Sequence, residues 1–211
     1  MRSPPSQLFL ALVITGTMGQ LATAEKEGPK KDGPEPWIAL FNGKDLTGWK
    51  TEGKARWEAQ GGLLSGRQGP RGEAGDLLTE ATYDDFELVV SFKVKWPANS
   101  GIWFRYQSPA QAYQADILEY KDPIAYSGSL YCSGKMFLAI NDDPKRVHRE
   151  GWNQLVIRSE GDRQQISING KQVADVRDGS SNKGRIGLQV HAGDAFTGMQ
   201  ITVKTFKLRK L

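Results

Sequence analysis

The chain has 211 residues, with 28 lysines and arginines against 24 aspartates and glutamates, and this length suits one all-β domain. The small basic excess is spread along the chain without a block of like charges, so we expect no nucleic-acid partner and no membrane-surface binding. A single cysteine, Cys132, excludes both an intramolecular disulfide and CxxC-type zinc sites. The folded part must therefore depend on a sizeable hydrophobic core.

The first 24 residues have the features of an export signal. An apolar run, Leu8–Ile14, follows Arg2, and Ala22-Thr23-Ala24 has the small-x-small form of a signal-peptidase site. The run is too short to span a bilayer as a stable helix. We therefore expect cleavage after residue 24, no membrane insertion of the mature protein, and a periplasmic or extracellular location. The alternative is an uncleaved N-terminal anchor. Residues 25–36 are charged and rich in Gly and Pro, which predicts a flexible linker.

From residue 37 to residue 211 the pattern is that of a single β-rich domain. Short apolar or alternating runs recur about every 8–12 residues between Gly, Pro, Asn and Asp, which is typical of a sandwich or barrel. Asn169-Gly170 predicts a type I′ hairpin turn, because both positions tolerate positive φ. The clearest predicted strands are 56–59, 63–65, 86–94, 101–106, 113–117, 154–159, 164–168, 171–176, 185–190 and 199–208. We expect two antiparallel sheets packed face to face, with few and short helices.

The candidate site lies in the segment Asn99–Tyr131. Its predicted strands Gly101–Tyr106 and Tyr113–Ile117 alternate, so their apolar members should face the core and the remaining side chains the opposite face. These remaining side chains can form hydrogen bonds or stack on a ring, and they are Trp103, Arg105, Gln114, Asp116, Ser129 and Tyr131. Such a set predicts a polar site of about the size of a sugar.

Several motifs follow one another in order along residues 37–211, and they are FNGKDLTGW (41–49), WE with GLL (57–64), DFEL (85–88), NSGIWFR (99–105), YQADI (113–117), GSLY (128–131), GWN (151–153) and GLQVH (187–191). Together they resemble the 3-keto-disaccharide hydrolase family, also described as 3-keto-glucoside 1,2-lyase and 3-keto-2-hydroxy-glucal hydratase. The resemblance implies a concanavalin A-like jelly-roll sandwich and a carbohydrate substrate. One departure concerns the candidate site, because the commoner family form is Tyr-Glu-Val-Gln-Ile. Here Gln114 stands in place of the glutamate and Asp116 two positions later, so the carboxylate moves along the strand but keeps its face.

The reaction that the resemblance implies has definite chemical needs. A ketone at C3 of a glycoside acidifies the hydrogen on C2, and its removal gives an enolate from which the C1–O bond breaks by β-elimination. Addition of water to the 2-hydroxy-glucal then gives the free 3-keto sugar. Such a site needs a base with a near-neutral pKa, a group that stabilises the enolate, and an acid for the leaving oxygen.

Four residues are the candidate catalytic groups. His191 could be base or acid, since its pKa lies near working pH; the alternative is a structural histidine at a strand end. Asp116 lies in an apolar strand, where a carboxylate is costly unless it faces a groove or is paired; the alternative is a salt bridge to Arg105. Arg105 itself could polarise an oxyanion with its fork of donors. Glu119 should sit at the strand end, either at the rim of the site or as an ordinary surface charge.

A second group of residues is expected to bind the substrate. Trp103 and Tyr131 could stack on a sugar ring, although aromatic residues in a sandwich are often core residues, and Trp49, Trp57 and Trp152 are assigned to the core. The polar members are Gln114, Ser129 and Gln189. A divalent metal ion could chelate the substrate's C2 and C3 oxygens with Asp116, Glu119 and His191 as ligands, but these residues form no spaced metal motif.

The sequence thus predicts an exported jelly-roll enzyme that cleaves 3-keto-glycosides by elimination, hydration or both. The first alternative is a non-catalytic carbohydrate-binding module of the same fold, which the absent glutamate favours. The second is an adhesion or envelope-structural domain, whose mark would be a groove filled by its own side chains.

Overall fold

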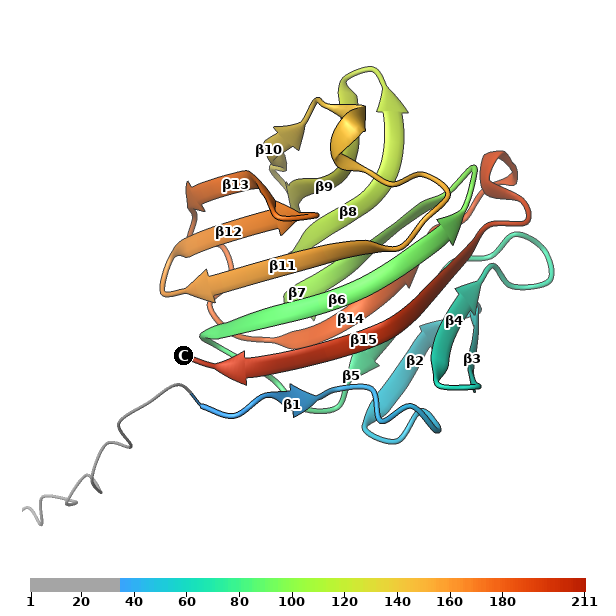
Figure 1. Cartoon of the computed structure of the whole chain (residues 1–211), viewed down its shortest axis with the longest axis horizontal. Helices are drawn as coiled ribbons and strands as arrows, with labels where there is room; N and C mark the ends of the chain where they lie inside the picture. Colours follow the sequence, from blue (N-terminus) through green and yellow to red (C-terminus); the bar gives the residue numbers. More distant parts are fainter. Residues whose placement is uncertain (1–34) are drawn as a thin grey trace, which may run out of the picture. The chain divides into compact units, whose positions relative to one another are not determined.

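The computed structural model describes residues 35–211, and the predicted signal peptide and most of the predicted linker lie outside them (Figure 1). Within these residues, two 3-10 helices, η1 (Pro144–Arg146) and η2 (Asp194–Phe196), accompany fifteen strands. No helix of the described part is long and apolar enough to cross a membrane. The strands are β1 (Ile38–Ala39), β2 (Trp49–Gly53), β3 (Arg56–Gln60), β4 (Leu63–Arg67), β5 (Gly75–Thr79), β6 (Phe86–Lys95), β7 (Asn99–Ser108), β8 (Gln111–Lys121), β9 (Ile124–Cys132), β10 (Met136–Asn141), β11 (Asn153–Glu160), β12 (Arg163–Ile168), β13 (Lys171–Arg177), β14 (Arg185–Val190) and β15 (Gln200–Lys210).

The strands form two antiparallel sheets, as Figure 1 shows. An eight-stranded sheet has the order β13-β12-β11-β6-β15-β4-β3, and β1 pairs with β15 in addition. A seven-stranded sheet has the order β10-β9-β8-β7-β14-β5-β2. In each sheet about half of the paired strands are consecutive in sequence, and the other pairs join distant parts of the chain. The predicted all-β, two-sheet sandwich is confirmed.

The hydrophobic core fills the space between the sheets. On β6 the alternation places Phe86, Leu88, Val90 and Phe92 inward, and all four are fully buried. β7 and β8 of the other sheet contribute residues of the same alternating kind: Ile102, Phe104, Tyr113, Ala115 and Ile117. Burial of each Val, Leu, Ile or Phe side chain in this set contributes about 1.5–3 kcal/mol, so the packing of these two faces is a major source of stability.

The ten strands named from the sequence are all present, and five further strands of residues 35–211 are not among them: β1, β2, β5, β9 and β10. The first two are mostly exposed strands at or near a sheet edge, and so lack the alternation that marks a half-buried strand. Asn169 and Gly170 have φ of 49° and 74°, as the predicted type I′ turn requires. Among the tryptophans, Trp49 is a core residue and Trp57 packs against the core, but Trp152 is not part of it. Trp152 instead lies on the surface below the ammonium groups of Lys93 and Lys204.

Candidate functional site

A pocket of about 230 Å³ lies on the face of the seven-stranded sheet that is turned away from the core. Its lining comes from β7, β8, β9, β10, β14 and the residue after β14, and consists of Asn99, Trp103, Gln114, Asp116, Tyr120, Tyr131, Met136, Phe137, Gln189 and His191. Six of the nine residues predicted for the site are in this set. The pocket therefore brings together side chains that lie up to 92 positions apart in sequence, from Asn99 to His191.

Strand register explains how these side chains meet. Gly101 on β7 pairs with Asp116 on one side and with Gln189 on the other. One step along the same face, Gln114 pairs with Trp103 and with Tyr131. Side chains directly opposite one another on neighbouring strands have Cβ atoms about 4.5–5.5 Å apart. Two adjacent rows across the sheet thus form the floor of the pocket.

Asp116 is the buried carboxyl group of the site. Only 4% of the residue is exposed, and within residues 35–211 its side chain has neither a hydrogen-bond partner nor an ion pair. Burial raises the pKa of this carboxyl group well above its ordinary value, because water no longer stabilises the charged form. The salt bridge to Arg105, considered as an alternative from the sequence, is not formed. Asp116 can therefore carry a proton at pH values where ordinary aspartates are ionised.

Gln114 is the second buried polar group, also 4% exposed. Its side chain folds over Gly101, since a Cβ atom placed on that glycine would lie 2.4 Å from Gln114 Cδ. Within the described part of the chain, Gln114 Nε2 is buried and has no acceptor. An unpaired buried donor costs about 1–3 kcal/mol, so this amide is a candidate ligand-binding group.

His191 lies at the exposed rim of the pocket, directly after β14. Its Nδ1 is 2.7 Å from the carbonyl oxygen of Ala192. Because a carbonyl can only accept, the contact assigns a proton to Nδ1, and in the neutral imidazole Nε2 then has a free lone pair. The neighbouring loop is held by Gln68, whose Nε2 donates to the carbonyl oxygens of His191 and Gly193. The geometry suits a base at the mouth of the pocket.

The aromatic wall of the pocket depends on a residue that the sequence did not reveal. Trp103 is nearly buried between the rings of Tyr106 and Tyr131, with centroid distances of 5.6 and 6.4 Å. Its indole Nε1 donates to Asp76 Oδ1 over 2.8 Å. Desolvation raises the pKa of Asp76, although the Trp103 hydrogen bond acts against it. Asp76 could have been found as the one charged residue of β5, but only if β5 had been recognised as a strand.

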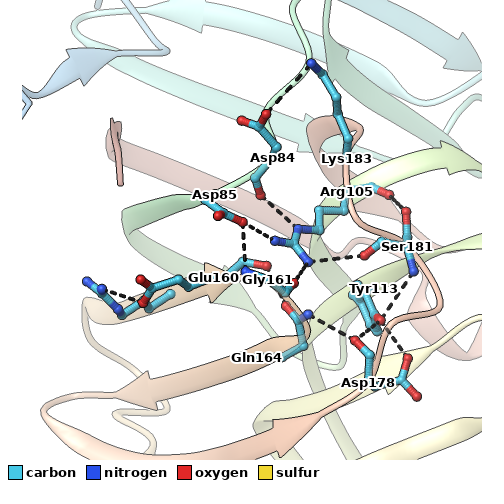
Figure 2. Close-up of polar contacts among 12 residues, drawn as sticks. Asp84, Asp85, Arg105, Tyr113, Glu160, Gly161, Gln164, Asp178, Ser181 and Lys183 are labelled. Atoms are coloured by element: carbon cyan, nitrogen blue, oxygen red, sulfur yellow. Dashed lines mark hydrogen bonds and ion pairs between the residues drawn. The ribbon is translucent and has the colours of Figure 1, made fainter. Parts of the chain in front are cut away.

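The prediction that Arg105 belongs to the site is wrong. Its φ of 48° and the register shift beside it form a bulge that turns the side chain away from the pocket face. Figure 2 shows the fully buried guanidinium surrounded by loop atoms. It donates to the carbonyl oxygens of Asp84, Gly161 and Ser181 and to Asp85 Oδ1 at 2.8 Å. Arg105 therefore ties three loops together and does not line the pocket.

Two further predicted residues also lie outside the pocket. Ser129 is fully buried. Its hydroxyl group donates to the carbonyl oxygen of Tyr126 and accepts from the backbone N–H of Asn141. Gly128, with φ of 96°, breaks the alternation directly before it. Glu119 is exposed and forms an ion pair with Arg149, Nε to Oε1 at 3.0 Å.

The metal ligands considered from the sequence are not brought together, because Glu119 is paired elsewhere while Asp116 and His191 line the pocket. In the described range 35–211, His, Cys, Asp and Glu side chains form no group of three that could hold a metal ion.

A larger hollow of about 520 Å³ lies on the outer face of the eight-stranded sheet. Its charged lining residues, Glu58, Lys93, Lys95 and Glu150, are exposed or half-buried, and none is a buried titratable group. The smaller pocket combines a buried carboxyl group, an unpaired amide and aromatic walls, which are the features of a binding site. We therefore assign the candidate site to the smaller pocket.

Comparison with known proteins relates the chain to a family by its sequence. Residues 36–209 match a family described as the 3-keto-alpha-glucoside-1,2-lyase-like domain. The 3-keto-disaccharide hydrolase of Bacteroides thetaiotaomicron is 32% identical over 77 residues, which are 32% of this chain and 27% of that protein. The matched segment thus spans about a quarter of the curated relative.

Solved structures share the fold at lower identity. A candidate glycosyl hydrolase from Parabacteroides distasonis superposes with a TM-score of 0.64 and 22% identity, covering 83% of this chain and all of that one. The carbohydrate-binding module CBM66 from Bacillus subtilis gives a TM-score of 0.62 at 19% identity, covering 79% of this chain and 98% of the module. Galectin-like and winged bean lectin structures share the same architecture. The predicted jelly-roll fold is confirmed.

Proposed function

Because the chain belongs to the 3-keto-alpha-glucoside-1,2-lyase-like domain family, we propose that it is an exported enzyme that cleaves 3-keto-glycosides. The observation that carries the proposal is the convergence of a base, His191, and a buried carboxyl group, Asp116, on one pocket. Removal of the C2 proton needs a base and a polar group that stabilises the enolate. The N-terminal signal-like sequence supports a periplasmic or extracellular location.

The proposed reaction begins with proton removal from C2 of the 3-keto sugar. His191 Nε2 takes the proton, and the C–H electron pair becomes the C2–C3 double bond of an enolate whose charge rests on the C3 oxygen. The ketone re-forms as the C1–O bond breaks, the leaving oxygen takes the proton that His191 removed from C2, and a 3-keto-2-hydroxy-glucal remains. Water then adds its oxygen to C1 and a proton to C2, which gives the 3-keto sugar.

The size and walls of the pocket support a sugar ligand. Its volume of about 230 Å³ is below the roughly 300–1,000 Å³ of sites for drug-sized ligands, which suits one sugar ring. The C–H face of such a ring can lie against the Trp103 and Tyr131 side chains. Gln189 adds a hydrogen-bonding group to the floor.

A non-catalytic carbohydrate-binding module is the second candidate function. The observation in its favour is Gln114, which stands where the commoner family sequence has a glutamate. A binding module would hold a sugar by the same aromatic wall and amides, without a need for the base at the rim.

One experiment separates the two functions. The protein is incubated with a 3-keto-disaccharide, with and without a chelator, and 3-keto-hexose and 2-hydroxy-glucal are measured. We expect both products, a strong loss of turnover in His191→Gln, and unchanged turnover in the exposed control Asp142→Asn. Loss of turnover in chelator alone would add a divalent ion to the mechanism. Ligand binding without either product would favour the binding module.

A further inference from the structure

Two buried polar groups without partners lie side by side at the floor of the pocket. Gln114 Nε2 and the Asp116 carboxyl group are both in residues that are 4% exposed, and neither finds a hydrogen-bond partner among the residues that the structure describes. More than nine in ten buried polar groups in proteins are paired. Gln114 Nε2 is such an exception. Together with the Asp116 carboxyl group in the same pocket, it indicates a ligand atom that binds both.

The backbone places these two groups close together. Asp116 is opposite Gly101 in the register of β7 and β8, and the Gln114 amide lies over the same glycine, where a Cβ atom would be 2.8 Å from Nε2. Because Gly101 has no side chain, the space above it belongs to Gln114 and to whatever occupies the pocket. The amide nitrogen and the carboxyl group thus border one volume.

We propose that Gln114 and the neutral carboxylic acid form of Asp116 are two hydrogen-bond donors that together bind an anionic oxygen, namely the C3 enolate oxygen of a 3-keto sugar. The substrate identity rests on the proposed function, whereas the donor pair rests on the geometry of the pocket. Neither group gives up its proton in the step. Both donate to the C3 oxygen more strongly while it carries the charge of the enolate than when it is a ketone.

A neutral acid suits this task better than a carboxylate. An ionised Asp116 would place a negative charge beside the developing enolate in a site of low dielectric constant, where like charges repel strongly. A carboxylic acid kept neutral by an apolar site can instead donate to an oxyanion, and each such donor typically contributes 10²–10³ in rate. Burial, which raises the pKa of Asp116, is consistent with this form.

Among residues 35–211, no lysine or arginine lines the pocket around Asp116. His191, Tyr120 and Tyr131 line the same pocket, and His191 lies at its exposed rim. Glu119 on the same strand is paired with Arg149. Asp76 on β5 lies further along the same row, beyond Gln189, and its hydrogen bond is to Trp103.

Substitutions at Asp116 distinguish a donor from a base. Asp116→Asn keeps a hydrogen-bond donor of the same size, so we expect turnover of a 3-keto-disaccharide within about tenfold of the wild type. Asp116→Leu and Gln114→Leu each remove one donor and should lose about 10²–10³ in turnover. Asp142→Asn, on the exposed surface, is the matched control. Thermal unfolding of each variant verifies that it is folded.

A second measurement does not depend on turnover. The infrared difference spectrum between wild type and Asp116→Asn at pH 7 should contain the carbonyl band of a protonated carboxylic acid, which a carboxylate lacks. A hydroxypyranone, a six-membered ring with an enolic oxygen beside a ketone, serves as the binding probe. Its anion should bind more weakly to Asp116→Leu and Gln114→Leu than to Asp116→Asn.

The outcomes separate the donor pair from the proposed function. If Asp116→Asn is as inactive as Asp116→Leu, Asp116 acts as a base and the donor pair is overturned. The proposed enzyme function would still stand. Absence of the protonated carbonyl band would overturn the donor pair as well. A protein that turns over no 3-keto-glycoside but binds the hydroxypyranone anion through both residues would refute the proposed enzyme and support the anion site. If the protein shows no turnover and binds no anion, both the donor pair and the proposed enzyme function are overturned.

Discussion

Trp103 donates its indole N–H to Asp76 Oδ1 over 2.8 Å, although the two residues lie on strands that do not pair with each other. Strand β14 runs between them, and its Gly187 is the residue opposite Trp103. A side chain at Gly187 would collide with Leu78, whose Cδ2 is 2.4 Å from the position of a Cβ atom. The bare glycine thus leaves room for Leu78, which packs in one buried cluster with Trp103. Asp76 in this way fixes one wall of the pocket from two strands away.

Replacement of Asp76 should loosen this wall. In Asp76→Leu the nearly buried indole N–H loses its acceptor, which costs about 1–3 kcal/mol, and Trp103 becomes free to change rotamer. Asp76→Asn keeps an oxygen acceptor and should remain close to the wild type. Chemical denaturation measures the loss of stability, and the emission maximum of tryptophan fluorescence reports on the wall. Equal stability of Asp76→Leu and Asp76→Asn would show that the hydrogen bond is not important.

The alternation of residues in strands was sufficient to predict most of the site. A period of two placed Trp103, Gln114, Asp116 and Tyr131 on the outer face, and the structure has all four lining one pocket. The hydrogen-bond acceptor of Trp103 could not be predicted from the sequence, because its contact with Asp76 depends on the order of strands in the sheet.

The errors arose where the backbone leaves the regular strand conformation. Arg105 has φ of 48° and Ser129 follows a glycine with φ of 96°. A non-glycine residue with positive φ is uncommon, and local composition gives no signal for one here. Beyond the bulge at Arg105, a side chain points to the opposite face of the sheet from the one that simple alternation predicts. Tyr106 therefore lies beside Trp103 and not in the core between the sheets.

Arg105 should be important for stability and not for chemistry. Arg105→Met leaves three loop carbonyl groups and the Asp85 carboxylate without their donor. Loss of one partner of a buried ion pair typically costs about 3–5 kcal/mol, and since Asp85 is partly exposed we expect the lower end. The comparison variant is Arg163→Met, whose exposed ion pair with Asp175 should contribute at most about 1 kcal/mol.

Chemical denaturation of both arginine variants gives the free energies of unfolding. Turnover per folded molecule should remain that of the wild type in Arg105→Met, because its guanidinium does not reach the pocket. A variant that is folded and yet inactive would return Arg105 to the catalytic site.

Gly101→Ala should disturb the pocket floor more than the fold. The new methyl group would lie 2.4 Å from Gln114 Cδ and 2.5 Å from its Cγ, so the Gln114 side chain must move. The contact is with a flexible side chain, and we expect a loss of stability of about 1–3 kcal/mol together with a larger loss of ligand affinity. Gly179→Ala, where no atom lies within 4 Å, is the matched control. Affinity equal in both variants would show that the position of Gln114 does not matter.

The raised pKa of Asp116 has a defined consequence for stability against pH. An aspartate in the unfolded chain ionises near pH 4, whereas burial keeps the folded carboxyl group protonated to higher pH. Above about pH 4 the folded state therefore binds more protons at this site than the unfolded state, and linkage makes the free energy of unfolding fall as pH rises until the folded group also ionises. Asp116→Asn removes this dependence, because its amide does not titrate. Denaturation of both proteins from pH 4 to pH 9 should show the variant gaining stability relative to the wild type as pH increases. A constant difference across this range would mean that Asp116 is ionised in the folded protein like an ordinary surface aspartate.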